Sequence, residues 1–395
     1  MNKTLFVLAA SVYQLPAIQT AKKMGYRVIT SDNIPSNPGH TYADKAYFVD
    51  TTDLDAILAV AKKERISGIF APATDVAVPT AAHVAHHMQL PGVPYKAAVI
   101  LTNKRLFRHF LQENHFLSPK MFVPVGTDLP DDIFDKERTW IIKPAISSGS
   151  KGIFIVRSRQ EFQARLEASR AMSKDGQAFV EEYIEGTQHT CEGLLEQGRV
   201  CVALITDRST APFPYVATCG HRVPSRLPAA LQEQAMQHIE RVFSLLNIQS
   251  SPFDCDFVAT DTHIVLLEIT PRLGGNSLSR LTQAALGIDL VAYAVAQACG
   301  DIYPFKTEPQ IQPAAVLLLG VPRAGRLVWS AEAEQSLRQK SWLGYLSFDL
   351  AQGTPVEPFI NGRHRVGEAL LLAPSRDQLD AYIQTFTDCL RLRAE

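Results

Sequence analysis

The stretch LLEITPRLGGNS, residues 266–277, changes its character halfway along. Its apolar start predicts a buried β-strand, and the carboxylate of Glu268 stands at the end of that strand. Arg272 follows, and then two glycines and an asparagine, which is the composition of a turn. Packing alone does not explain an acid, a base and a Gly-Gly turn at the end of a buried strand. The stretch therefore indicates a functional site.

A second acid precedes this stretch in an apolar setting. Asp256 lies in SPFDCDFV, residues 251–258, and the turn sequence TDTH separates its predicted strand, 253–259, from the strand that carries Glu268. Two antiparallel strands joined in this way would bring the two carboxylates side by side. At about 4 Å and an effective dielectric constant of about 20, they would repel each other by about 4 kcal/mol. That repulsion is a large fraction of a domain's stability.

A cation or a proton must offset this repulsion. Arg272 is one candidate, and it would then form a structural ion pair with the acids. The other candidate is a divalent ion, because two hard oxygen ligands suit Mg²⁺ that bridges phosphate groups. On that hypothesis Glu268 holds the metal and Arg272 faces the reacting group.

A glycine- and serine-rich segment follows another apolar strand in IIKPAISSGSKGIFIV, residues 141–156. Pro144 keeps Lys143 extended, and residues 147–152 predict a turn between two antiparallel strands. Small residues let backbone N–H groups approach an anion. The order of residues is not that of a Walker A loop. The segment is either an ordinary exposed hairpin or a lid over phosphates.

The stretch FVEEYIEG, residues 179–186, predicts a strand that ends in acids and a glycine. Backbone groups at such a strand end can pair with the edge of an adenine, and a Glu can accept its amino group. The alternative is a solvated acidic strand end.

Three bases, His221, Arg222 and Arg226, gather in CGHRVPSRL, residues 219–227, although the whole chain is nearly neutral. A surface loop would explain them, because Arg is common on surfaces. The functional alternative is a groove opposite the Gly-Gly turn, where an Arg would pair with a substrate carboxylate or the departing phosphate.

The first ~90 residues alternate between predicted strands and helices, which favours a doubly wound parallel sheet. The first strand-to-helix turn, AASVYQLP, lacks the G-x-G-x-x-G pattern, so a dinucleotide site is disfavoured. The Pro/Gly break LPGVPY, residues 90–95, predicts the first domain boundary. Short strands and loops beyond about residue 311 predict a third, smaller unit.

Composition excludes some partners. A net charge of −1 gives no overall field for nucleic acid or an anionic membrane, and no apolar run approaches the ~18 residues of a membrane span. The six cysteines are scattered, which predicts a reducing cytoplasm. A cleaved signal peptide is disfavoured because cleavage would remove the first predicted strand.

The ordered set of Lys104, Lys143, the Ser/Gly hairpin, 181–184, Asp256, Glu268 and Arg272 resembles the ATP-grasp superfamily of ATP-dependent carboxylate–amine (or –thiol) ligases. The resemblance covers about residues 1–300. It implies a mixed α/β and α+β ATP-grasp fold in three parts. These are an N-terminal α/β preATP-grasp domain at 1–92, an ATP-grasp domain at 93–310 with a lid-like subdomain at about 118–186, and a C-terminal appendage at 311–395.

The resemblance also implies ATP and Mg²⁺ as cofactors, with Mn²⁺ as an alternative ion, small-molecule carboxylate and amine substrates, and a homodimer. Residues implied to bind the nucleotide are Lys104, Lys143, Ser147, Ser148, Gly149, Gly152, Glu181, Glu182, Ile184 and Gln188. The implied metal ligands are Asp256, Glu268 and Thr270. Arg272 and Lys143 are the implied catalytic residues, and Gly274, Gly275 and Asn276 would contact substrate.

Two residues depart from the family pattern. Gln188 stands where the family has a Glu for the ribose, and Thr270 stands where it has a metal-binding Asn. Two alternatives therefore stay open. One is a carboxylase or formyl-transfer enzyme of the purine-biosynthesis type on the same scaffold, and the other is an ATP-binding regulator that has lost catalysis. The retained set of Asp256, Glu268 and Arg272 disfavours the regulator.

Overall fold

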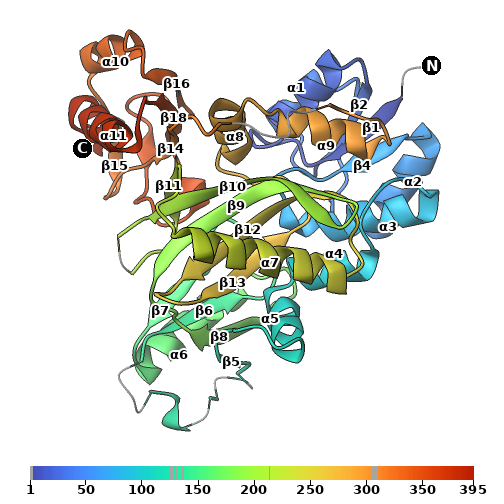
Figure 1. The fold of residues 1–395 in the computed structure, drawn as a ribbon, viewed down its shortest axis with the longest axis horizontal. Coiled ribbons are helices and arrows are strands. Elements are labelled where there is room, and N and C mark those ends of the chain that lie inside the picture. Colours follow the sequence, from blue (N-terminus) through green and yellow to red (C-terminus); the bar gives the residue numbers. More distant parts are fainter. Residues whose placement is uncertain are drawn as a thin grey trace.

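The computed structural model describes residues 3–395 apart from 125, 127, 130, 135–137, 213 and 305–309. An N-terminal unit, a small lid unit and a C-terminal unit surround a large central sheet (Figure 1). No single helix in the described ranges is long and apolar enough to cross a membrane. The helices Leu278–Leu286 and Leu290–Ala298 reach the required length and hydropathy only when taken together, and the chain bends by 114° between them.

The N-terminal unit is a parallel sheet with the strand order β3-β2-β1-β4. Alternate residues of its central strand β1 face opposite hydrophobic clusters, with Leu5 on one side and Phe6 on the other. The predicted doubly wound sheet is thereby confirmed. Its elements are β1 (Thr4–Leu8), α1 (Leu15–Lys23), β2 (Arg27–Ser31), β3 (Lys45–Tyr47), α2 (Leu54–Glu64), β4 (Gly68–Phe70) and α3 (Val78–Met88).

Two helices lead from this unit to the lid. They are α4 (Tyr95–Thr102), which the sequence analysis did not predict, and α5 (Lys104–Glu113). Asn103 separates them, and its side chain accepts hydrogen bonds from the first N–H groups of α5. The lid is a four-stranded sheet with the order β5-β8-β6-β7. It consists of β5 (Met121–Phe122), β6 (Trp140–Pro144), β7 (Phe154–Val156), α6 (Arg159–Arg170) and β8 (Ala178–Glu182).

The central sheet has eight strands in the order β13-β12-β9-β10-β11-β14-β18-β16. Its first part contains β9 (Thr187–Glu196), β10 (Arg199–Thr210), β11 (Thr218–Val223), β12 (Ser251–Ala259) and β13 (Ile264–Thr270). Helix α7 (Ala229–Leu245) packs on one face of it through a shared cluster of apolar side chains. Helices α8 (Leu278–Leu286) and α9 (Leu290–Ala298) then return to the N-terminal unit, where α9 lies beside α1 (Figure 1).

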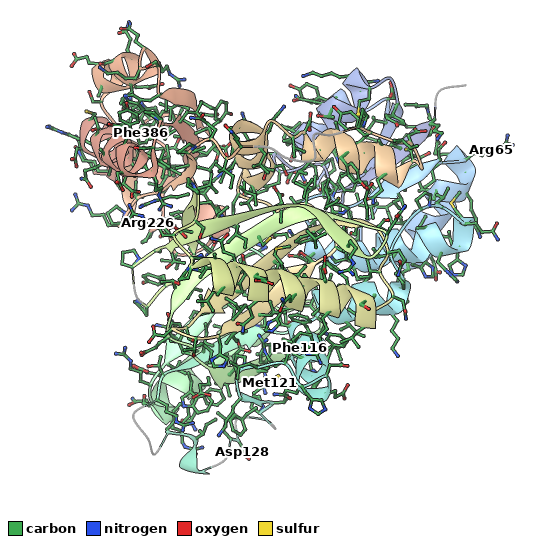
Figure 2. All side chains as sticks on the ribbon, in the orientation of Figure 1. Arg65, Phe116, Met121, Asp128, Arg226 and Phe386 are labelled. Carbon is green, nitrogen blue, oxygen red and sulfur yellow. The ribbon has the colours of Figure 1, made fainter. Side chains whose placement is uncertain are left out.

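The C-terminal unit has its own hydrophobic core, which includes Phe386 (Figure 2). It contains β14 (Ala314–Leu319), β15 (Gly325–Val328), α10 (Ala331–Arg338), β16 (Leu343–Phe348), β17 (Pro355–Val356), β18 (Gly367–Leu372), α11 (Arg376–Leu390) and β19 (Arg393–Ala394). Strand β14 pairs with β11, so the central sheet continues across the predicted boundary at residue 311. The predicted domain limits stay predictions, but the C-terminal part is built into the main sheet.

Candidate active site

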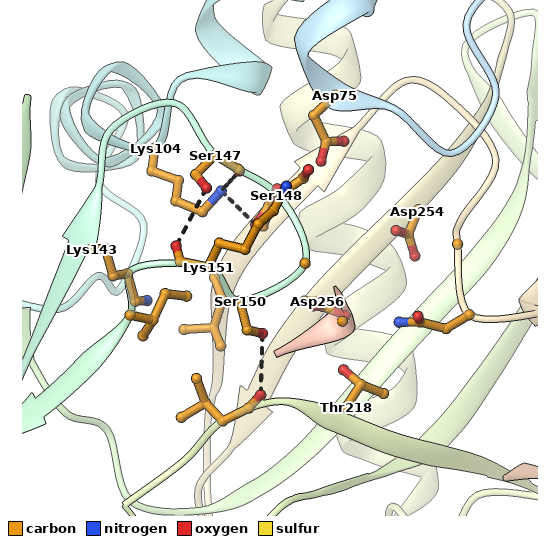
Figure 3. Close-up of a pocket in the computed structure, with 18 of the residues that line it drawn as sticks. Asp75, Lys104, Lys143, Ser147, Ser148, Ser150, Lys151, Thr218, Asp254 and Asp256 are labelled. Carbon is orange, nitrogen blue, oxygen red and sulfur yellow. Dashed lines mark hydrogen bonds and ion pairs between the residues drawn. The ribbon is translucent and has the colours of Figure 1, made fainter. Parts of the chain in front are cut away.

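A cavity of about 420 Å³ lies where the four parts of the molecule meet (Figure 3). The loop after β4, the start of α5, the lid hairpin between β6 and β7, and the end of β8 contribute to its wall. Strands β10, β12 and β13 contribute side chains from the central sheet, and the loop before β18 contributes residues 362–363.

Most residues that were predicted to bind nucleotide, metal or substrate line this one cavity. They are Lys104, Lys143, Ser147, Ser148, Gly149, Glu181, Glu182, Ile184, Gln188, Asp256, Glu268, Arg272, Gly275 and Asn276. Segments that lie far apart in the sequence therefore meet at one place.

The two carboxylates of the β12–β13 hairpin lie directly opposite each other, because Asp256 and Glu268 are register partners. The predicted juxtaposition is confirmed. Each carboxylate is held by its own base, with 2.8 Å from Arg208 Nη1 to Asp256 Oδ2 and 3.1 Å from Lys104 Nζ to Glu268 Oε2. Arg272, the cation proposed from the sequence for a structural ion pair, contacts neither of them in the ion pairs of the described residues.

A β-bulge brings an extra residue of β13 to the cavity. Asp256 pairs with Glu268, but the next residue of β12 pairs with Leu266, so Leu267 has no partner on that strand. Arg108 from α5 donates to the carbonyls of Leu266 at 2.9 Å and Leu267 at 3.2 Å. The bulge lets adjacent residues, Leu267 and Glu268, both line the cavity.

Glu181, at the end of β8, forms ion pairs with two buried bases. Arg108 Nε donates to Glu181 Oε2 at 2.9 Å, and Lys143 Nζ bonds to the other carboxylate oxygen. Burial raises the pKa of Glu181, but the charges of Arg108 and Lys143 outweigh burial and leave that pKa lowered. Burial also lowers the pKa of Lys143, although Glu181 opposes this change. The carboxylate predicted to take an adenine amino group is thus already engaged by two bases.

The Ser/Gly hairpin contacts several neighbouring parts of the molecule. Lys104 Nζ donates to the Ser147 carbonyl at 3.0 Å, and Ser150 Oγ donates to the Val216 carbonyl at 3.4 Å (Figure 3). The Gly362 N–H of the C-terminal unit donates to the Gly149 carbonyl at 3.0 Å. The hairpin is therefore held over the cavity by contacts with three other segments.

Arg272 is buried between two carboxylates from different parts of the molecule. Its Nε lies 2.7 Å from Asp75 Oδ1, in the loop after β4, and its Nη1 lies 2.6 Å from Asp254 Oδ2, on β12. Burial lowers the pKa of Arg272, but the two carboxylates outweigh it and raise that pKa. The N-terminal unit is thereby tied to the reacting wall of the cavity.

Glu192 on β9 holds the glycine turn at Gly274 in place through a hydrogen bond to its backbone. Its carboxylate is fully buried and accepts from the Gly274 N–H at 2.9 Å and from the hydroxyls of Ser279 and Thr282 at 3.0 Å each. Burial, followed by the nearby charge of Asp254, raises the pKa of Glu192 from 4.5 to about 8. Burial also raises the pKa of Asp254 to about 7.

We predict that replacing Glu192 by Gln removes a pH dependence of stability. Between pH 4.5 and about 8 the folded protein holds a proton on Glu192 that the unfolded chain releases. The free energy of unfolding therefore falls as pH rises, by at most about 1.4 kcal/mol per pH unit from this group. Urea unfolding at pH 5.5 and pH 7.5 should show a smaller decrease for Glu192→Gln. An equal decrease in both proteins would contradict the prediction.

Some predicted residues do not line the cavity. They are Gly152, Thr270 and Gly274. Thr270 is fully buried opposite Asp254, and its hydroxyl has no hydrogen-bond partner among the described residues. Its geometry gives no support to the metal-ligand prediction.

The three bases of residues 219–227 also lie elsewhere, contrary to the functional alternative that placed them in the groove. His221 is buried against Thr206 at 3.0 Å, and burial lowers its pKa to about 3. Arg222 forms an ion pair with Asp380 of α11 at 3.1 Å, and Arg226, which is labelled in Figure 2, forms an ion pair with the same carboxylate. The reason is that β14 pairs with β11, and α11 of the C-terminal unit supplies carboxylates to the two arginines.

Further residues of the cavity wall were not predicted from the sequence, namely Tyr13, Asp75, Arg208, Asp254 and Arg363. Asp254 could have been found, because it precedes Asp256 by two residues and so shares its face of the strand. Asp75 follows the end of a parallel strand, where α/β sheets bind ligands. No local sequence pattern marks Arg208 or Arg363.

The donor chemistry fits a divalent ion held jointly with phosphates. Asp256 and Glu268 offer carboxylate oxygens on facing strands, and their side chains are 29% and 26% exposed. No group of three or more His, Cys, Asp or Glu side chains in the described part of the chain could hold a metal. A metal at this pair would therefore need further oxygen ligands.

Residues 137–280 match the model of the ATP-grasp domain. Formate-dependent phosphoribosylglycinamide formyltransferase of Haemophilus ducreyi is 22% identical over 380 residues, which cover 92% of this chain and 90% of that enzyme. The solved L-amino acid ligase from Bacillus licheniformis has a TM-score of 0.81 and 18% identity, over 99% of this chain and 98% of that chain. N5-carboxyaminoimidazole synthetase from Staphylococcus aureus, solved with ADP, has a TM-score of 0.77 and 13% identity, over 98% of each chain. The protein thus contains an ATP-grasp domain at residues 137–280 and has the fold of these solved ATP-grasp structures.

Proposed function

We propose that the protein activates a carboxylate as an acyl phosphate and joins it to an amine, with an amino acid as at least one substrate. ADP and phosphate are the other products. The observation that carries this proposal is the Asp256–Glu268 pair, which faces a cavity whose other walls hold Lys104, Lys143 and the Ser/Gly hairpin. This arrangement suits phosphoryl transfer, where catalysis consists mainly of positioning and charge neutralisation.

In this reaction the lysines and the hairpin would bind the ATP phosphates. Asp256 and Glu268 would hold Mg²⁺, with Mn²⁺ as the alternative ion, and a bound ion supplies charge neutralisation at the phosphoryl oxygens. Arg208 and Lys104 neutralise the two carboxylates. With a metal held by these carboxylates, both bases would be available to bind phosphate oxygens. The related structure that holds ADP supports a nucleotide site in this fold.

Arg272 would stabilise the oxyanion of the acyl phosphate and of the tetrahedral intermediate. Its guanidinium is oriented by Asp75 and Asp254, and it lines the cavity together with Gly275 and Asn276. A donor that is fixed before the reaction needs no reorganisation in the transition state.

A second candidate is formyl transfer or carboxylation, with formate or bicarbonate as the activated acid. The similarity to the formyltransferase over 92% of the chain favours it. The L-amino acid ligase matches the fold with the higher TM-score of the two solved structures compared above. The two candidates share the nucleotide site and differ in the carboxylate.

The test is phosphate release from ATP and Mg²⁺ across paired amino acids, small carboxylates, formate and bicarbonate, with product masses measured. We expect release that requires both a carboxylate and an amine, at least one of them an amino acid. Release with formate or bicarbonate, and with no amino-acid pair, would support the second candidate instead. ATP binding without release for any pair would contradict both and favour a regulator. The implied homodimer stays a prediction that analytical ultracentrifugation can check.

A further inference from the structure

One acid of the cavity wall orients Arg272 but contacts no substrate in the reaction described above. Asp254 lines the cavity from β12, and its side chain is 16% exposed. Its Oδ2 accepts from Arg272, but its buried Oδ1 has no hydrogen-bond partner among the described residues. A buried carboxylate with an unbonded oxygen is unfavourable for folding, so it calls for another explanation.

The glycine turn packs closely against one oxygen of Asp254. A Cβ atom at Gly274 would lie 3.2 Å from Asp254 Oδ1 and 2.6 Å from Leu278 Cδ1. The turn can therefore pass close to the acid only with a glycine at this position. Next to it, Gly275 and Asn276 line the cavity, and Gly275 has no atom close to where a Cβ would stand. The acid thus sits beside an open part of the wall.

Among the described residues, Asp254 shares the base that contacts it with a second carboxylate, Asp75. Three carboxylates lie here: Asp75, Asp254 and, behind the turn, Glu192. Arg272 is the base that contacts two of them, and Lys151 of the lid hairpin is close enough to Asp75 to interact electrostatically with it. Asp256 and Glu268, in contrast, each have a base of their own, and Glu192 holds a proton below about pH 8.

Figure 3 shows how the charges are separated across the cavity. Lys104 and Lys143 lie on one side, and Asp254 lies on the opposite side, with Asp75 above it. A phosphate-binding side and an acidic side therefore face each other. A substrate with one positive group would be attracted to the acidic side.

We propose that Asp254 binds the ammonium group of the amine substrate, and that Arg272 and Asp75 hold Asp254 in place for this contact. The inference rests on the proposed ligase function and names the class of its second substrate, a protonated primary amine such as an amino acid. Neutral nucleophiles would not need this acid.

The test compares wild-type protein with Asp254→Asn, which keeps the shape of the side chain and an oxygen for Arg272 but removes the charge. We expect the KM for the amine substrate to rise about tenfold or more, which equals about 1.4 kcal/mol. The KM for ATP and that for the carboxylate should stay unchanged. Hydroxylamine, which is largely uncharged at neutral pH, should still trap the acyl phosphate as a hydroxamate, and the rate of this trapping should fall much less than kcat/KM for the amine substrate.

Glu196→Gln is the matched control, because Glu196 is a partly buried acid of the same sheet that bonds to Tyr293 and does not line the cavity. It should leave every constant unchanged. An unchanged amine KM in Asp254→Asn, or a loss of hydroxamate formation, would overturn the inference and leave Asp254 as a support for Arg272. Failure of the proposed function is a separate result, since wild-type protein would then form no hydroxamate with any carboxylate.

Discussion

Replacing Glu268 by Gln is expected to reduce turnover by about 100-fold or more, which corresponds to about 2.7 kcal/mol of transition-state stabilisation. The amide keeps the size of the side chain but removes the charge that faces Asp256 in the hairpin. A divalent ion loses a charged oxygen ligand, and its neutralisation of the phosphoryl oxygens weakens. The measurement is phosphate release at saturating substrates, with Mg²⁺ varied, and higher Mg²⁺ should restore part of the activity.

The control for this variant is Asp261→Asn, in the exposed turn of the same hairpin, which should leave turnover unchanged. Nucleotide affinity should fall much less than turnover in Glu268→Gln, because Lys104 is released from Glu268 and still bonds to the Ser147 carbonyl. Near-normal turnover at ordinary Mg²⁺ would show that Glu268 does not hold the metal.

Replacing Arg108 by Met is expected to destabilise the protein by about 3–5 kcal/mol, the usual effect of removing one partner from a buried ion pair. Arg108 and Glu181 are each 1% exposed, and Arg108 also satisfies the carbonyls of the bulge at Leu266 and Leu267. Without it, Glu181 keeps one buried base, Lys143, and two carbonyls lose their donor. Urea unfolding followed by circular dichroism would measure the change.

A matched variant separates burial from the loss of an arginine. Arg199→Met removes an ion pair with Glu240 at 3.2 Å, but the Arg199 side chain is 82% exposed. We expect that change to stay within about 0.5 kcal/mol, as for most surface substitutions. If the two variants unfold at the same urea concentration, the cluster around Glu181 does not stabilise the fold as described.

The sequence alone determined the β12–β13 hairpin and the meeting of Asp256 with Glu268. Both strands are rich in apolar residues, and the short turn between them fixes an antiparallel pair. The N-terminal sheet followed from its alternation of strands and helices in the same way. These features depend on neighbours in the sequence, so local hydrophobic patterns and turn residues were enough to predict them.

The partners of the charged side chains were decided only by the tertiary structure. Arg272 pairs with Asp75, which lies far away in the sequence and belongs to another unit, and Arg226 pairs with α11. Such pairs form because folding buries or crowds charges that must then find the nearest opposite charge, whatever its distance along the chain. The bulge at Leu267 likewise depends on Arg108 from α5 to satisfy its carbonyl. The sequence therefore determined which strands carry the acids, and tertiary packing determined which bases face them, because electrostatic partners are chosen by proximity in space.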